Sequence, residues 1–296
     1  ITWGGGIVSN RAAGGPQVNL TFGGTDSANI PLRGFTARNV ISRNPAGYGS
    51  ANLRFFNVAS TGQDAICEDA YLVGGFSGGN GRLTIQQMNW NSFQARRNTM
   101  INLNNQPIIE TDDTVYTPYT VWEDQAFFGT DPTALRWRSG PGFTDRTWAA
   151  WKTFTGLGNA AGHADTAQTT LPTSAKVFVR PVNAVEYGRG HVVIFNWPLS
   201  ARIPVDLTGI LAVGDNIVVR NVQDYWGAHI PVYDAPSAGN EVTVWTGVPV
   251  YFPMTGVPAP TPYGFNNSAL NAWQNQFDYP GGKTAPDFDT FIVSTV

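Results

Sequence analysis

The chain lacks the means to hold itself together with disulfide bonds, because Cys67 is the only cysteine among its 296 residues. Charged side chains are also scarce, at 13% of the sequence against a usual share of about 25%. Apolar residues make up 42%, which is ample for a core. We therefore expect stability to come from a large core or a stacked architecture, and a surface solvated by neutral polar groups.

Other absences exclude whole classes of function. The formal net charge is −3 and no dense cluster of Lys and Arg occurs, which argues against a nucleic-acid partner. No run of about 18 apolar residues exists, so we expect no membrane-spanning helix. The three histidines, His163, His191 and His229, are far apart and no CxxC or HxxxH occurs, which excludes the usual zinc spacings.

Helical signals are few and strand signals are many. The 33 glycines and 20 prolines are scattered every few residues and would break most helical windows. Short β-branched or aromatic runs, such as NLRFFNVA, RLTIQQMNW, AKVFVRPV, HVVIFNW, NIVVRNV, EVTVW and FDTFIVS, are bounded by turn residues and predict an all-β protein. The exception is 144–156, where a cap at Thr144 or Asp145, an aromatic stripe and a stop at Gly156 predict one helix.

Residues 17–130 carry an approximate repeat. The segments Phe35-Thr-Ala-Arg38 and Phe93-Gln-Ala-Arg96 share one pattern, and polar turns separate successive strand-like runs. A coil of roughly 20 to 30 residues is expected when each turn of a solenoid carries two or three short strands. A sandwich of unrelated hairpins could mimic this pattern, so the repeat alone leaves both arrangements open.

The texture of the sequence changes near residue 166. Residues 166–175 are predicted to be a linker, and the short strands after it alternate with turns in the manner of a sandwich. We predict parallel β-helix coils over 1–165, with the short helix capping them, and an antiparallel β-sandwich over 176–296. A Pro/Gly/Asn-rich tail at 257–285 interrupts this sandwich domain.

The stretch 134–165, ALRWRSGPGFTDRTWAAWKTFTGLGNAAGHAD, resembles the end of the β-helix in right-handed parallel β-helix proteins of the pectate-lyase-like superfamily. The matches are Leu135-Arg136-Trp137, Trp148, Trp151, Thr155 and Gly156, whereas GNAAGHAD departs from the family's turn. The segment from Lys176 onward is similar to the β-sandwich that follows such helices. The resemblance implies the architecture more than an activity, since the superfamily includes glycan lyases, hydrolases and phage tailspikes.

Acidic residues near 110 are the candidates for catalysis. Glycoside hydrolysis needs two carboxylates that flank the scissile bond, and Glu110 and Asp112 are spaced to share one face of a strand. A polyuronate lyase would use an Arg base such as Arg96 and Ca²⁺, for which Asp112 and Asp113 would be partial ligands. These acids could equally be solvated loop residues, so whether the protein is an enzyme stays open.

Aromatic residues near the acidic group could bind sugars, because a flat ring stacks on the apolar face of a pyranose. The candidates are Trp90, Tyr116, Tyr119 and Trp122. Ordinary core packing is the alternative role for the same residues.

Two functions fit the sequence. The first is an extracellular or cell- or virion-surface protein that binds, and in an enzymatic version cleaves, polysaccharide or a cell-surface glycan. The second is a self-associating structural protein, such as a spike, a filament subunit or a coat component, without catalytic activity. The low charge, the high Gly, Asn and Thr content and the lack of a catalytic signature favour the second function, so the two stay nearly balanced, with polysaccharide binding slightly ahead.

Overall fold

The computed structural model describes residues 2–3, 20–24, 33–43, 53–57, 62–74, 85–88, 90–102, 107–111, 119–129, 136–139, 144–158, 161–182, 185–222, 225–254 and 288–296. The chain forms two compact units, Ile1–Leu171 and Pro172–Val296. Each unit has its own hydrophobic core. The predicted tail at 257–285 lies outside the described residues.

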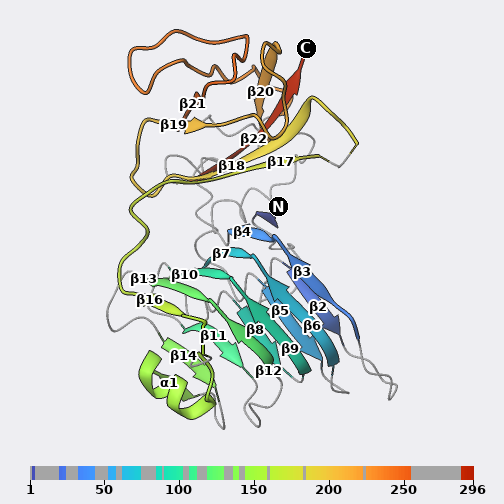
Figure 1. Ribbon diagram of the computed structural model, residues 1–296, viewed down its shortest axis with the longest axis vertical. Coiled ribbons are helices and arrows are strands. Elements are labelled where there is room, and N and C mark those ends of the chain that lie inside the picture. Colours follow the sequence, from blue (N-terminus) through green and yellow to red (C-terminus); the bar gives the residue numbers. More distant parts are fainter. Residues whose placement is uncertain are drawn as a thin grey trace, which may run out of the picture. The chain divides into compact units, whose positions relative to one another are not determined.

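The first unit is built from three sheets through which the chain passes in turn (Figure 1). Sheet A contains β1 (Thr2–Trp3), β4 (Ile41–Arg43), β7 (Tyr71–Gly74), β10 (Thr99–Asn102), β13 (Ala126–Gly129) and β16 (Thr166–Gln168). Sheet B contains β2 (Leu20–Gly24), β5 (Leu53–Asn57), β8 (Ile85–Met88), β11 (Pro107–Thr111), β14 (Arg136–Ser139) and the antiparallel β15 (Thr144–Arg146). Sheet C contains β3 (Thr36–Arg38), β6 (Gly62–Glu68), β9 (Trp90–Arg96) and β12 (Tyr119–Glu123).

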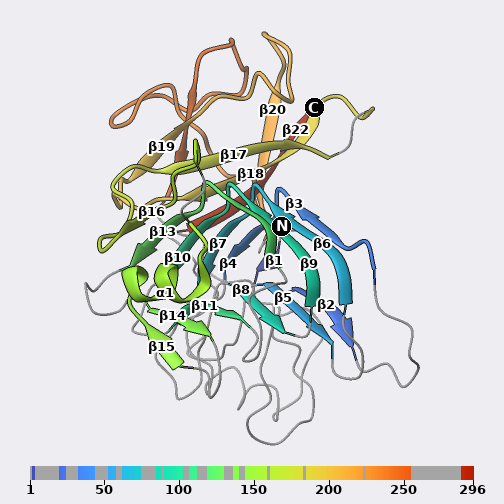
Figure 2. The ribbon, with the colours of Figure 1, turned by 60° about the horizontal axis from the view of Figure 1, so that its bottom comes forward.

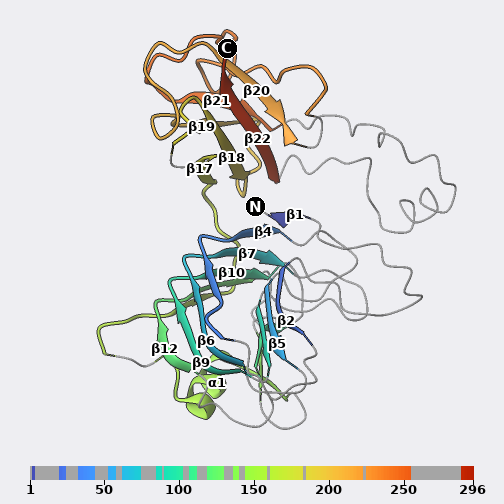
Figure 3. The same cartoon turned by 90° about the vertical axis from the view of Figure 1, so that its right-hand side faces the viewer.

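Strands three apart in the chain pair in parallel, so each coil lies directly on the coil before it (Figures 2 and 3). These parallel sheets are compatible with the predicted β-helix, and they rule out antiparallel hairpins for the paired strands. Ala37 pairs with Cys67 and Cys67 with Ala95, so the two segments with the Phe-x-Ala-Arg pattern occupy equivalent positions two coils apart. The right-handed winding of the coils stays a prediction.

A sharp turn joins sheet C to sheet A at the same place in every coil. Asn39, Asp69, Arg97 and Asp124 all take a left-handed conformation there, with φ between 50° and 54°. Asn and Asp adopt this conformation more readily than other residues with a side chain, which explains three of the four positions. The fourth, Arg97, makes two hydrogen bonds to Asp69, at 2.8 and 2.9 Å.

Aromatic rings fill the core of the last coils. Phe127, Trp137 and Trp151 are fully buried, and the centroids of neighbouring rings in this cluster lie 4.8 to 6.5 Å apart. The predicted helix is α1 (Trp148–Thr155), and it packs on β14. Its N-cap is Thr147, not Thr144 or Asp145, because 144–146 pair with β14 as strand β15.

The second unit is an antiparallel sandwich (Figure 3). One sheet has the order β17 (Lys176–Pro181), β18 (Arg189–Phe195), β22 (Phe288–Thr295), β20 (Ile217–Asn221), and the other pairs β19 (Arg202–Val205) with β21 (Val250–Pro253). Side chains of both sheets share one core, where the rings of Phe252 and Phe291 meet with centroids 5.1 Å apart.

Two details of the sequence prediction differ from the structure. The predicted linker begins with Thr166–Gln168, which instead forms β16 and extends sheet A along β13. The predicted strand EVTVW at 241–245 makes only isolated bridges at Glu241 and Val244. Conversely, β19 and β21 supply the second sheet of the sandwich although neither was among the predicted strands.

Candidate functional site

Glu110 belongs to an ion-pair network on the outward face of sheet B. Trp137 packs in the core, so the next residue, Arg138, lies on the opposite face of its strand, and Glu110 pairs with Arg138 in register and shares that face. Arg138 Nη1 lies 3.4 Å from Glu110 Oε2, and its Nε lies 2.6 Å from Asp145 Oδ1. Hydrogen bonding to Asp145, followed by the charge of Glu110, raises the pKa of Arg138. We call Glu110, Arg138 and Asp145 the sheet B network.

The network is shielded from water even though it faces outward. Glu110 is only 4% exposed, and the side chains of Arg138 and Asp145 are 16% and 25% exposed. Charged groups with so little hydration interact more strongly with each other and with a bound polar ligand than exposed ones do. Glu110 on β11 and Asp145 on β15 both pair with the guanidinium of Arg138, which lies on the strand between them, β14.

Arg96, the predicted lyase base, lies in a different place. It belongs to sheet C, where its Nε is 3.1 Å from Glu123 Oε2 and its Nη1 is 3.8 Å from Glu68 Oε2. Arg38 pairs with Glu68 in turn, so Arg38, Glu68, Arg96 and Glu123 form a ladder of alternating charge up the solenoid. The structure therefore brings Glu110 together with Arg138 and places Arg96 among Glu68 and Glu123.

A second ladder, of uncharged and acidic groups, lies on the inner side of the same turn. The Asn98 side chain accepts from Ala70 N at 3.0 Å and donates to the Cys67 carbonyl at 2.9 Å and to Gln125 Oε1 at 3.0 Å. Asp165 continues the row by accepting from Gln125 N at 2.7 Å. These groups satisfy the buried backbone of the turn, which is a structural role.

The turn that differs from the family's pattern, GNAAGHAD, adds one residue to each ladder. His163 Nε2 lies 3.7 Å from Glu123 Oε1 in the charge ladder, and Asp165 follows Gln125 in the inner ladder. His163 Nδ1 lies 3.0 Å from Asp124 Oδ2, and that hydrogen bond raises the pKa of His163. The Ala164 N–H donates to Asp124 Oδ1 at 3.0 Å. His163 and Asp165 thus end the stack of coils at its last turn.

Of the aromatic residues predicted to bind sugars, the structure describes the side chain of Trp122 and the strand positions of two others. Trp122 is 6% exposed, its ring packs on Trp151 with centroids 5.3 Å apart, and its Nε1 donates to Asp165. It is a core residue, so its ring offers no platform to a sugar. Trp90 begins β9 and Tyr119 begins β12, and their side chains are outside the described part of the structure. Tyr116, Asp112 and Asp113 lie outside the described residues.

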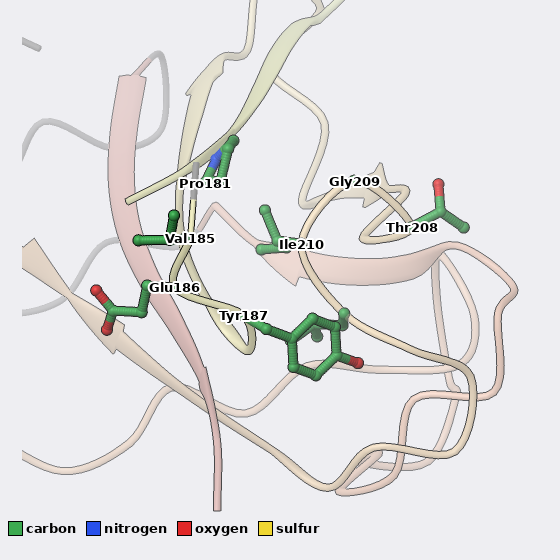
Figure 4. Close-up of a pocket in the computed structure, with 8 residues that line it drawn as sticks. Pro181, Val185, Glu186, Tyr187, Thr208, Gly209 and Ile210 are labelled. Atoms are coloured by element: carbon green, nitrogen blue, oxygen red, sulfur yellow. The ribbon is translucent and has the colours of Figure 1, made fainter. Parts of the chain in front are cut away.

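The sandwich unit contains two recesses of ligand size. The first, of about 340 Å³, is lined by Pro181, Val185, Glu186, Tyr187, Thr208, Gly209, Ile210 and Leu211 (Figure 4). Tyr187 donates to Asp215 Oδ2 at 2.6 Å, and this hydrogen bond raises the pKa of the Tyr187 phenol. The second, of about 360 Å³, has apolar walls from β20 and 230–242, with His229 and Glu241 among its lining residues.

Metal and thiol chemistry find little support in the described part of the chain. Within those residues, no group of three or more His, Cys, Asp or Glu side chains could hold a metal ion. Cys67 is fully buried, as its apolar neighbours predict, and burial raises the pKa of its thiol far above the usual range. The helix described here is too short and too polar to cross a membrane.

Comparisons with known proteins do not identify the chain. No family model matches it, and no match was found among curated proteins or solved structures. The sheets show an all-β protein with parallel coils and an antiparallel sandwich. Its membership of the pectate-lyase-like superfamily stays a prediction from the residues quoted above.

Proposed function

We propose that this is an extracellular or surface protein that binds polysaccharide, with the outward face of sheet B as the binding face. The observation that carries the proposal is the sheet B network, in which a nearly buried carboxylate and guanidinium lie side by side on the outside of a solenoid. Arg138 and Asp145, whose side chains are 16% and 25% exposed, offer a donor and an acceptor to the hydroxyl groups of a sugar, and the nearly buried Glu110 holds Arg138 in place. Neighbouring strands of sheet B lie about 4.8 Å apart, so the sheet presents a long row of outward side chains along the stack, which suits a polymeric ligand.

Binding is favoured over cleavage by the position of Arg138. Inverting hydrolysis needs two acids roughly 6.5 to 9.5 Å apart with room for a water and the scissile bond between them. Glu110 and Asp145 lie on strands that flank β14, so their backbones are about 10 Å apart at the usual strand spacing. Arg138 lies on the strand between them and forms an ion pair with each, which leaves cleavage by lyase or hydrolase chemistry as the secondary prediction.

Removing both acids of the network is expected to weaken polysaccharide binding about tenfold or more, because the acceptor Asp145 loses its charge and Arg138 loses the two carboxylates that hold it in place. The double variant Glu110→Gln, Asp145→Asn keeps the shape of both side chains. Binding would be measured by affinity electrophoresis and calorimetry against a panel of plant, microbial and animal polysaccharides, with cleavage followed by release of reducing ends.

The matched control is Glu68→Gln, Glu123→Gln, which removes the same number of charges from the charge ladder of sheet C. It should bind like the wild type, and thermal melting should show both double variants folded. Equal binding by the wild type and the sheet B variant would reject this face as the site.

A structural, self-associating protein is the second candidate, and one observation favours it. The sandwich unit exposes two neighbouring apolar side chains, since Val213, 69% exposed, lies against Gly247, and the next residue, Val248, is 59% exposed; adjacent exposed apolar groups can belong to a contact surface. Sedimentation velocity over a range of protein concentrations should then show assembly that Val213→Ser, Val248→Ser reduces.

A further inference from the structure

Trp226 is placed where folding does not require it. Its side chain is 81% exposed, whereas Trp137, Trp151 and Trp245 are fully buried. Tryptophan contributes to stability chiefly through the large apolar area that it buries, so an indole in water contributes little. An exposed ring of this size suits contact with a ligand or a partner better than packing.

The loop that carries Trp226 is held in one conformation. Arg220, on β20, donates through Nη1 to the carbonyl oxygens of Tyr225 at 3.2 Å and of Gly227 at 2.7 Å. The Tyr225 ring meets the Trp226 ring edge to face, with centroids 4.9 Å apart and an interplanar angle of 83°. The indole is thus oriented before any ligand arrives, which lowers the entropic cost of binding.

Polar groups and a recess follow directly after the loop. The Ile230 N–H donates to the Val219 carbonyl at 2.7 Å, so the segment that leaves the loop runs beside β20. His229 Nε2 lies 3.1 Å from Glu241 Oε1, and both residues line the recess of about 360 Å³. Both side chains are accessible, at 60% and 46% exposure.

We propose that Trp226 and Tyr225, with His229 and Glu241, bind a neutral pyranose unit of a polysaccharide. The apolar face of the sugar ring stacks on the indole, and its hydroxyl groups exchange hydrogen bonds with the imidazole and the carboxylate. Of the described cationic groups in this stretch of the chain, Arg220 donates to the loop carbonyls and His229 is paired with Glu241, which favours a neutral sugar over a polyanion. The proposal rests on the proposed function and adds a second polysaccharide contact, in the sandwich unit.

Replacing Trp226 by alanine is expected to raise the dissociation constant for a neutral hexasaccharide about tenfold or more, and replacing it by phenylalanine about threefold. The probes are cellohexaose, xylohexaose, laminarihexaose, maltohexaose and chitinhexaose, titrated calorimetrically into the full chain. Leu199→Ala is the matched control, since Leu199 is 61% exposed in the same unit but is not among the residues of the platform. Trp226 is exposed, so the variants should melt at the wild-type temperature.

Three results would overturn the inference, and they differ in what they say of the proposed function. Unchanged binding by Trp226→Ala, together with loss of binding in the sheet B variant, rejects the platform and keeps polysaccharide binding. Failure of every probe and polysaccharide to bind the wild type rejects both. Loss of self-association in Trp226→Ala, with sugar binding intact, assigns the ring to a protein contact instead.

Discussion

Replacing Asn98 by alanine is expected to lower the free energy of unfolding of the solenoid unit by about 2 to 5 kcal/mol. The Asn98 side chain is fully buried and serves Ala70 N and the Cys67 carbonyl, neither of which can reach water after the substitution. Each buried group left without a partner costs about 1 to 3 kcal/mol, and the lost contact with Gln125 adds to that. A change of this size is a large fraction of the stability of an ordinary domain.

Urea unfolding followed by circular dichroism, with hydrogen exchange to locate the change, would measure the effect. Thr36→Ala is the control, because Thr36 is an exposed residue of the same sheet and its loss should change stability little. Retention of wild-type stability by Asn98→Ala would show that the inner ladder does not support the coils.

Replacing Asp289 by asparagine is expected to stabilise the sandwich unit at neutral pH and to leave it almost unchanged near pH 4. Burial raises the pKa of Asp289 to about 6, against about 3.9 in an unfolded chain. The folded state therefore holds this proton more tightly than the unfolded state does. The stabilisation from this proton is complete below pH 4 and is lost as the pH rises through 6.

At pH 7 the wild type carries an ionised carboxylate that is 2% exposed. Because the pKa of Asp289 is about 6 in the folded state and about 3.9 in the unfolded chain, this ionisation lowers the free energy of unfolding by on the order of 3 kcal/mol. Asparagine removes that charge, and its oxygen can still accept from Asn221 Nδ2 and Thr290 N, which now donate at 2.8 Å. Denaturant unfolding at pH 4 to 8, read by hydrogen exchange of β18 and β22, should show the stability gap between variant and wild type growing with pH.

The control for this pH series is Asp206, whose pKa is lowered by folding, whereas that of Asp289 is raised. A hydrogen bond from the Thr208 backbone lowers the pKa of Asp206, so its contribution is present at neutral pH and lost as the pH falls. Asp206→Asn should therefore destabilise the sandwich unit at pH 7 and have little effect in acid. Parallel pH profiles for the wild type and Asp289→Asn would show that Asp289 does not titrate in this range.

The stacked coils could be predicted because they follow from local pattern. Ala37, Cys67 and Ala95 occupy one inward position of sheet C in successive coils, and the next coil places Trp122 there, so the position is apolar in each coil but small only in the first three. Gly156 ends the helix in a left-handed conformation, as its position in the sequence predicts. The start of the helix could not be fixed in this way, because β14 recruits 144–146 as a strand.

The candidate site was only partly predictable. Glu110 was singled out from the sequence, but Arg96 was assigned to it by proximity along the chain, and the two residues lie on different sheets. Arg138 and Asp145 were missed as its partners, since the pairing depends on the register of β11, β14 and β15. For Trp122 the sequence leaves sugar binding and core packing open, and the structure confirms core packing, which the alternation of the strand with Glu123 facing out also indicates.

By itself the sequence determined that the chain is all-β, that its first half carries an approximate repeat and that one short helix interrupts the strands, because propensity and periodicity act over a few residues. Only the tertiary structure decided which charges meet, since partners such as Arg38 with Glu68 and Arg96 with Glu123 stand 30 and 27 residues apart. It also decided that Trp122 is buried and Trp226 exposed. Both outcomes depend on how coils and sheets stack, and a residue's neighbours along the chain do not specify that stacking.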